Sequence, residues 1–142
     1  EEIECFVIKI SSFLPVSHPL TLPIQVQAGD NIFTLTPERY VDMLVHELIH
    51  ILLTQNDSLL EKYFNYLMEK KYHSEPFNTQ IHVLVHAIHK KLFKKFFPQD
   101  RLDEELKMSS YYPDYKRSWE IVNSEGEDKI IQEMKSYLKN KH

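Results

Sequence analysis

Two histidines, His46 and His50, interrupt an apolar stretch of the sequence, residues 41–53, at a spacing of four residues. Apart from Asp42 and Glu47 the rest of this stretch is apolar, so we expect a helix that is buried on all sides. Residues four apart lie on one face of a helix, which places Asp42, His46 and His50 in one stripe. Two imidazole groups in apolar surroundings need polar partners, and their nitrogens can converge on a single Zn²⁺ ion.

The pentapeptide HELIH, residues 46–50, resembles the HExxH signature of the zincin metallopeptidases, and its apolar flanks are similar to the buried helix that carries this signature in the family. The resemblance implies that His46 and His50 bind the zinc ion. It also implies that Glu47 is the general base, which takes a proton from a metal-activated water and passes it to the leaving amine. The resemblance extends over residues 36–89 at most.

A zincin needs a third protein ligand. The metzincin continuation is excluded because Leu53 and Asn56 stand where that subfamily has Gly and His. Gluzincins place a Glu on the next helix, and Glu69 lies at the matching distance of nineteen residues after His50. Met68 replaces the Asn that usually precedes this Glu, so Glu69 is retained as an alternative third ligand of a minimal gluzincin-like site.

Histidines interrupt a second strongly apolar segment, residues 78–89, where His82 and His86 are again four apart. If three consecutive helices alternate in direction, the third runs parallel to the first and His82 falls level with the first histidine pair. We therefore predict His82 as the third ligand, with Glu69 or His86 as the alternatives. The competing interpretation is a pair of core histidines that are hydrogen-bonded to carbonyl groups or water.

Three further side chains are candidates for supporting roles. Asp42 could accept a hydrogen bond from a ligand imidazole and fix its tautomer. His86 could orient a ligand or donate a hydrogen bond to a developing oxyanion, and Tyr115 could act as a transition-state donor. Trp119, on the same helical face as Tyr115, is expected to pack in the core.

The pattern of residues predicts an α+β fold. Residues 5–10 and 24–27 favour strands, and residues 32–35 can pair with the second of these across a turn. A small N-terminal antiparallel sheet (residues 1–35) would then pack on a mostly helical zincin-like body (residues 36–142) within a single domain. Helices are expected at residues 36–53, 58–72, 78–96, 100–107, 111–122 and 127–139.

Composition restricts the function classes. The net charge of −4 gives no general attraction for nucleic acid or anionic membranes, and two glycines provide no phosphate-binding loop. Cys5 is the only cysteine, so a metal must be held by nitrogen and oxygen ligands. The absence of an apolar run of about 18 residues favours a soluble protein, and the single cysteine fits the reducing cytoplasm.

The function predicted from these features is hydrolysis of peptide bonds in a peptide or protein substrate by a metallopeptidase with one Zn²⁺ ion. The alternative is a catalytically silent zincin-like domain that keeps the metal and acts as a binding or regulatory module. A further alternative is a helical protein whose histidines are ordinary core residues without a metal.

Overall fold

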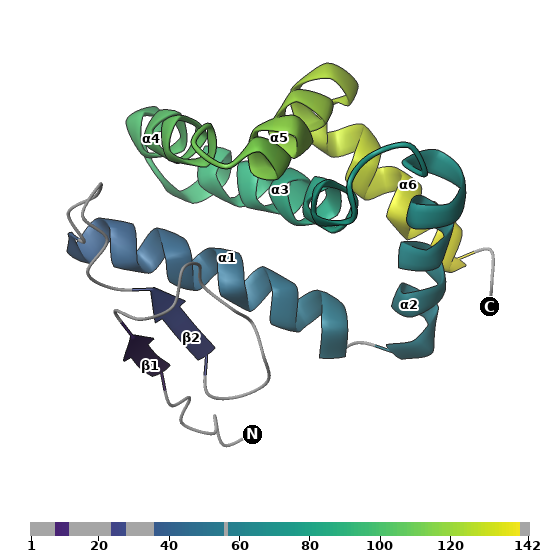
Figure 1. Cartoon of the computed structure of the whole chain (residues 1–142), viewed down its shortest axis with the longest axis horizontal. Helices are drawn as coiled ribbons and strands as arrows, with labels where there is room; N and C mark the ends of the chain where they lie inside the picture. The colour runs from purple at the N-terminus through teal and green to yellow at the C-terminus, as the bar shows by residue number, and fades with distance from the viewer. Residues whose placement is uncertain (1–7, 12–23, 28–35, 56, 140–142) are drawn as a thin grey trace. The chain divides into compact units, whose positions relative to one another are not determined.

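The computed structural model describes residues 8–11, 24–27, 36–55 and 57–139 (Figure 1). The chain divides into two compact units, residues 1–53 and 54–142, which we call the first and second units. The first unit contains strands β1 (Ile8–Ser11) and β2 (Ile24–Gln27) and most of helix α1 (Pro37–Gln55).

Helix α1 begins where the sequence predicts. The Thr36 Oγ1 atom accepts a hydrogen bond from the Arg39 amide at 3.2 Å, and Pro37 occupies the first helical position. The hydroxyl satisfies one of the amide groups that a helix leaves unpaired at its start, and the proline lacks such an amide. Within the first unit, Tyr40, Met43 and Leu44 of α1 pack against the buried side chain of Ile51.

The predicted α+β fold with a small antiparallel sheet is wrong. All elements described between Pro37 and Lys139 are helices, so the fold class is all-helical. The only strands among the described residues are β1 and β2, which have four residues each and pair in parallel. The period-two pattern of residues 24–27 predicts an extended segment, but it specifies neither the partner nor the direction of pairing. The predicted strand at residues 32–35 and the turn before it lie outside the described residues.

All secondary-structure elements described in the second unit are helices. Its elements are α2 (Asp57–Tyr66), the π-helix η1 (Leu67–Lys71), α3 (Phe77–Phe96), α4 (Gln99–Ser109), α5 (Pro113–Glu125) and α6 (Glu127–Lys139). The predicted helices of this region are confirmed to within three residues at their ends, and one of them differs internally. The segment predicted as a single helix at residues 58–72 ends in a π-turn, where the Tyr72 amide donates to the Leu67 carbonyl at 2.7 Å.

Helix α3 is the central element of the second unit, and α4, α5, α6 and η1 all pack against it (Figure 1). The buried run from Val83 to Ala87 covers several faces of α3, as expected for a helix that is surrounded by others. The helix ends at Phe96, which confirms the predicted end at residue 96. Its start at Phe77 lies one residue before the predicted start at residue 78.

Trp119 connects α5 to the neighbouring helices and is almost fully buried, which confirms its predicted role in the core. Its indole N–H donates to Ser109 Oγ at 3.0 Å, and that hydroxyl donates to the buried carboxylate of Glu105 at 3.1 Å. The polar edge of the ring is therefore satisfied inside the core, as a buried indole requires. Helix α5 extends to Glu125, three residues beyond its predicted end at residue 122, and stops before Gly126, whose φ of 89° lies in the left-handed region that favours glycine.

Glu127, the first residue of α6, ties this helix to α3. Its buried carboxylate forms ion pairs with Lys90 and Lys94. Burial by itself raises the pKa of Glu127, but the hydrogen bonds from Lys94, from its own backbone and from Lys90 outweigh burial and lower the pKa to about 2. The ionised carboxylate therefore stabilises the folded state, because the same group in the unfolded chain has a pKa near 4.3.

We expect Glu127→Gln to lower the free energy of unfolding at pH 7 by about 1–2 kcal/mol. The folded-state pKa lies below the unfolded-state pKa, so this contribution is fully present above about pH 4.5 and is lost as the pH falls towards 2. Urea titrations of both proteins at pH 7 and pH 3 measure the difference. Asp128→Asn is the control, since its ion pair with Lys91 is largely exposed and contributes little. A difference that stays the same at pH 3 would contradict the role of the charge.

Candidate metal centre

His46 and His50 lie one turn apart on α1, and their rings converge. The two Nε2 atoms are 3.1 Å apart, and the rings meet edge to face with centroids 4.9 Å apart. The four-residue spacing produces this convergence, as the sequence predicts. Asp42 extends the same stripe by one turn and is buried, while its predicted role in fixing a ligand tautomer stays a prediction.

The separation of the two nitrogen atoms is close to that of two ligands on one metal ion. Nitrogen ligands lie roughly 2.0–2.1 Å from a tetrahedral zinc ion, so two of them are about 3.3 Å apart. A direct hydrogen bond between the rings requires one Nε2 atom to carry a proton. Metal binding requires both Nε2 atoms to be unprotonated, so a proton and a metal ion compete for this pair.

Glu47 follows His46 on α1 and is 3% exposed. Burial raises the pKa of this carboxyl group to about 8. Among the described residues, none forms a hydrogen bond with its Oε2 atom. A cation bound by the histidine pair would favour the ionised carboxylate, so both the nitrogen donors and Glu47 fit a metal centre.

His82 belongs to the second unit, on α3, and is buried. Its Nδ1 atom is 2.7 Å from the Asn78 carbonyl oxygen, which can only accept, so Nδ1 carries the ring hydrogen. Burial lowers the pKa of His82 to about 4, against the opposing effects of the Asn78 carbonyl and the Asp114 carboxylate. The ring is therefore neutral at pH 7, and its Nε2 atom is the unprotonated nitrogen. This is the protonation state that a zinc ligand requires, with the other nitrogen oriented by a carbonyl group.

The second unit also brings Tyr115 and His86 to His82. The Tyr115 ring, on α5, lies 4.3 Å from the His82 ring and 5.6 Å from the His86 ring. His86 stacks on Trp119 with ring centroids 4.3 Å apart. Its Nδ1 atom donates to Ser118 Oγ at 2.6 Å, because the single hydroxyl hydrogen of Ser118 goes to the Tyr115 carbonyl at 2.8 Å. These contacts hold His86 in the core and fix the start of α5 beside His82.

Glu69 lies on the π-helix η1, and its side chain is exposed. Water already stabilises the charge of an exposed carboxylate without a metal ion. The exposure of Glu69 therefore favours His82 as the third ligand. Ser118, the partner of His86, could not be identified from the sequence. The two residues are 32 positions apart, and no local pattern relates them.

The comparisons with known proteins give one result. No protein-family model matches the chain, and no curated protein or solved structure matches it. In the described part of the chain, no helix combines the length and the apolar character needed to cross a bilayer.

Proposed function

We propose that this chain is a zinc-dependent peptidase in which His46 and His50 bind the metal and Glu47 is the general base. The observation that carries the proposal is the convergence of the two Nε2 atoms, 3.1 Å apart on α1, beside a buried carboxyl group. The resemblance of residues 46–50 to the zincin signature supports it. The substrate class is a peptide or a protein, and the single cysteine fits a cytoplasmic location.

In the proposed hydrolysis, the metal ion polarises the reacting groups and Glu47 transfers the proton. When bound, zinc supplies Lewis-acid polarisation of the scissile carbonyl and of a water molecule. Glu47 accepts a proton from that water as the oxygen adds to the carbonyl carbon. It then gives the proton to the amine nitrogen as the carbon–nitrogen bond breaks. The burial of Glu47 limits exchange of this proton with bulk water.

His82 is the proposed third ligand. Its neutral ring, with Nδ1–H donated to the Asn78 carbonyl, presents the nitrogen that zinc requires. The alternatives are weaker, since Glu69 is exposed and His86 is stacked on Trp119 in the core.

Elemental analysis of the untagged, purified protein tests the proposal. We expect about one equivalent of zinc, as in a site with three protein ligands and one open position. His82→Gln should lose the metal, whereas Glu69→Gln should retain it. His73→Gln, at an exposed histidine, is the control for nonspecific binding by imidazole. Zinc-free protein even after reconstitution would overturn the proposed function.

A further inference from the structure

The ring of Tyr115, on α5, packs against the ring of His82, on α3. The two centroids are 4.3 Å apart and the ring planes are tilted by 37°. Aromatic pairs in proteins usually have centroids about 4.5–7 Å apart, so these two rings are in direct contact. Tyr115 is half-buried, and its ring also meets the rings of His86 and Tyr112 at 5.6 and 5.7 Å. Rings from both helices therefore surround Tyr115 and limit its movement.

The orientation of the His82 ring has two determinants. The Asn78 carbonyl oxygen lies 2.7 Å from the Nδ1 atom and holds one edge of the ring. The outer torsion of a histidine side chain has a broad energy profile, so one hydrogen bond does not define the plane of the ring. The contact with Tyr115 is the second constraint, because a rotation of the imidazole towards Tyr115 would make the two rings overlap.

Hydrogen bonds on both sides of Tyr115 tie the first turn of α5 to α3. The Thr79 hydroxyl donates to the Asp114 carbonyl at 3.2 Å. The Tyr115 carbonyl accepts a hydrogen bond from the Ser118 hydroxyl at 2.8 Å, and that hydroxyl accepts one from the His86 ring at 2.6 Å. The side chains of Thr79, Ser118 and His86 are buried, so water does not compete for these contacts.

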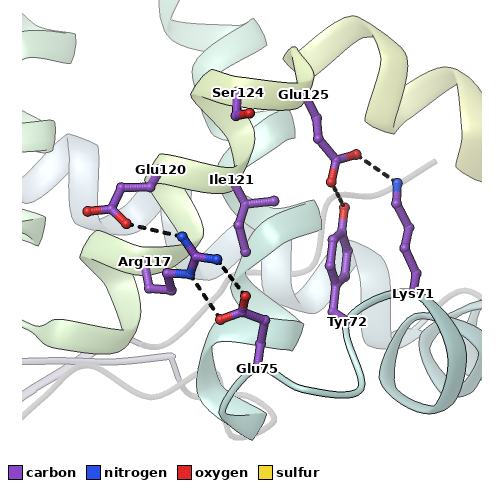
Figure 2. Close-up of a pocket in the computed structure, with 8 residues that line it drawn as sticks. All are labelled: Lys71, Tyr72, Glu75, Arg117, Glu120, Ile121, Ser124 and Glu125. Carbon is purple, nitrogen blue, oxygen red and sulfur yellow. Dashed lines mark hydrogen bonds and ion pairs between the residues drawn. The ribbon is translucent and has the colours of Figure 1, made fainter.

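The loop between η1 and α3 provides a further attachment. Arg117 of α5 donates two hydrogen bonds to Glu75 of this loop, at 2.7 and 3.0 Å (Figure 2). The buried Gln80 side chain of α3 donates to the carbonyls of Tyr72 and Glu75 at 2.8 and 2.9 Å. The loop is thus fastened to α3 by Gln80 and to α5 by Arg117, which holds the start of α5 near the start of α3.

We propose that Tyr115 is a positioning residue, whose ring acts with the Asn78 carbonyl to hold the His82 imidazole in one orientation and so prepares its Nε2 atom as a metal ligand. This inference rests on the proposed function, in which His82 is the third ligand. The contact is made by the ring, so the phenolic hydroxyl is not required. A transition-state donor, in contrast, requires the hydroxyl.

The first test reads the His82 ring in the metal-free protein. Long-range ¹H–¹⁵N spectra of the ¹⁵N-labelled full chain distinguish a protonated from an unprotonated ring nitrogen, and the signals lost in His82→Gln identify His82. We expect the unaltered chain and Tyr115→Phe to carry the ring hydrogen on Nδ1. Tyr115→Leu, which removes the aromatic ring, should show a mixture of the two tautomers.

The second test is zinc affinity, measured by competition with a chromophoric chelator. Partners that orient a metal-binding histidine typically contribute 10–100-fold to affinity, so Tyr115→Leu should bind zinc about 10-fold more weakly. Tyr115→Phe should bind zinc as the unaltered chain does. Tyr137→Leu is the matched control, because it removes a partly buried ring that packs on Tyr63 and Tyr66 at 5.2 and 5.5 Å. It should lower stability and leave the His82 signals and the zinc affinity unchanged.

The outcomes separate positioning from packing. If Tyr115→Leu does not fold, Thr79→Val takes its place, since it keeps the size of a buried side chain and releases the Asp114 carbonyl beside Tyr115. Unchanged His82 signals or unchanged zinc affinity in the variant used would overturn the proposal. Equal losses in Tyr115→Phe and Tyr115→Leu would overturn it too, because they would assign the effect to the hydroxyl. In a chain that binds no zinc, the spectra still decide whether Tyr115 orients His82, so this failure is distinguishable from that of the proposed function.

Discussion

Replacing His46 by alanine is expected to weaken zinc binding by the purified chain by more than about 100-fold. The variant removes one of two Nε2 atoms that lie 3.1 Å apart, and a single imidazole on α1 then remains for the ion. His50→Ala should have the same effect. Competition with a chromophoric chelator gives the affinity, and elemental analysis gives the bound equivalents.

The control for this prediction is His73→Ala, which removes an exposed histidine whose Nδ1 atom is hydrogen-bonded to the nearby Lys70 carbonyl at 3.2 Å. It should bind zinc as the unaltered chain does. Retention of zinc by His46→Ala and by His50→Ala would show that other residues hold the ion, and the assignment of the pair on α1 would then be wrong.

The features of the fold that sequence predicts well are those with local causes. The start of α1 follows from one hydroxyl and one proline, and the end of α5 follows from Gly126. The direction in which β1 and β2 pair depends on contacts between segments far apart in sequence, so the alternation of residues could not predict it. The π-turn before Tyr72 also has no counterpart in the helical pattern of residues 58–72.

The same distinction between local and long-range causes applies to the contacts of the histidine and charged side chains. The convergence of His46 and His50 follows from a four-residue spacing on one helix, and the contact of His82 with the Asn78 carbonyl spans one turn. By contrast, the pairing of Glu75 with Arg117 joins residues 42 positions apart, and no periodicity relates them. Sequence patterns therefore predict pairs within a helix, whereas the pairing of Glu75 with Arg117 depends on the packing of α5 beside the loop that precedes α3.

Replacing Glu47 by glutamine is expected to leave zinc binding intact and to slow peptide hydrolysis by about 1,000-fold or more. The amide has almost the same size and cannot accept the proton of the attacking water. The effect is measured as the rate at which each zinc-loaded protein hydrolyses a mixed-sequence library of fluorescence-quenched peptides. Zinc content measured on the same samples separates a loss of chemistry from a loss of metal.

The structure indicates that this variant folds. Burial raises the pKa of Glu47 to about 8, which means that the charged carboxylate is unfavourable at this position without a cation. A neutral side chain of equal size avoids that cost, so the thermal midpoint of the metal-free protein should not fall. Loss of activity in a folded, zinc-loaded Glu47→Gln protein would therefore report on proton transfer. If both proteins bind one zinc ion and neither cleaves any peptide, the catalytic proposal fails and the metal-binding module is the remaining function.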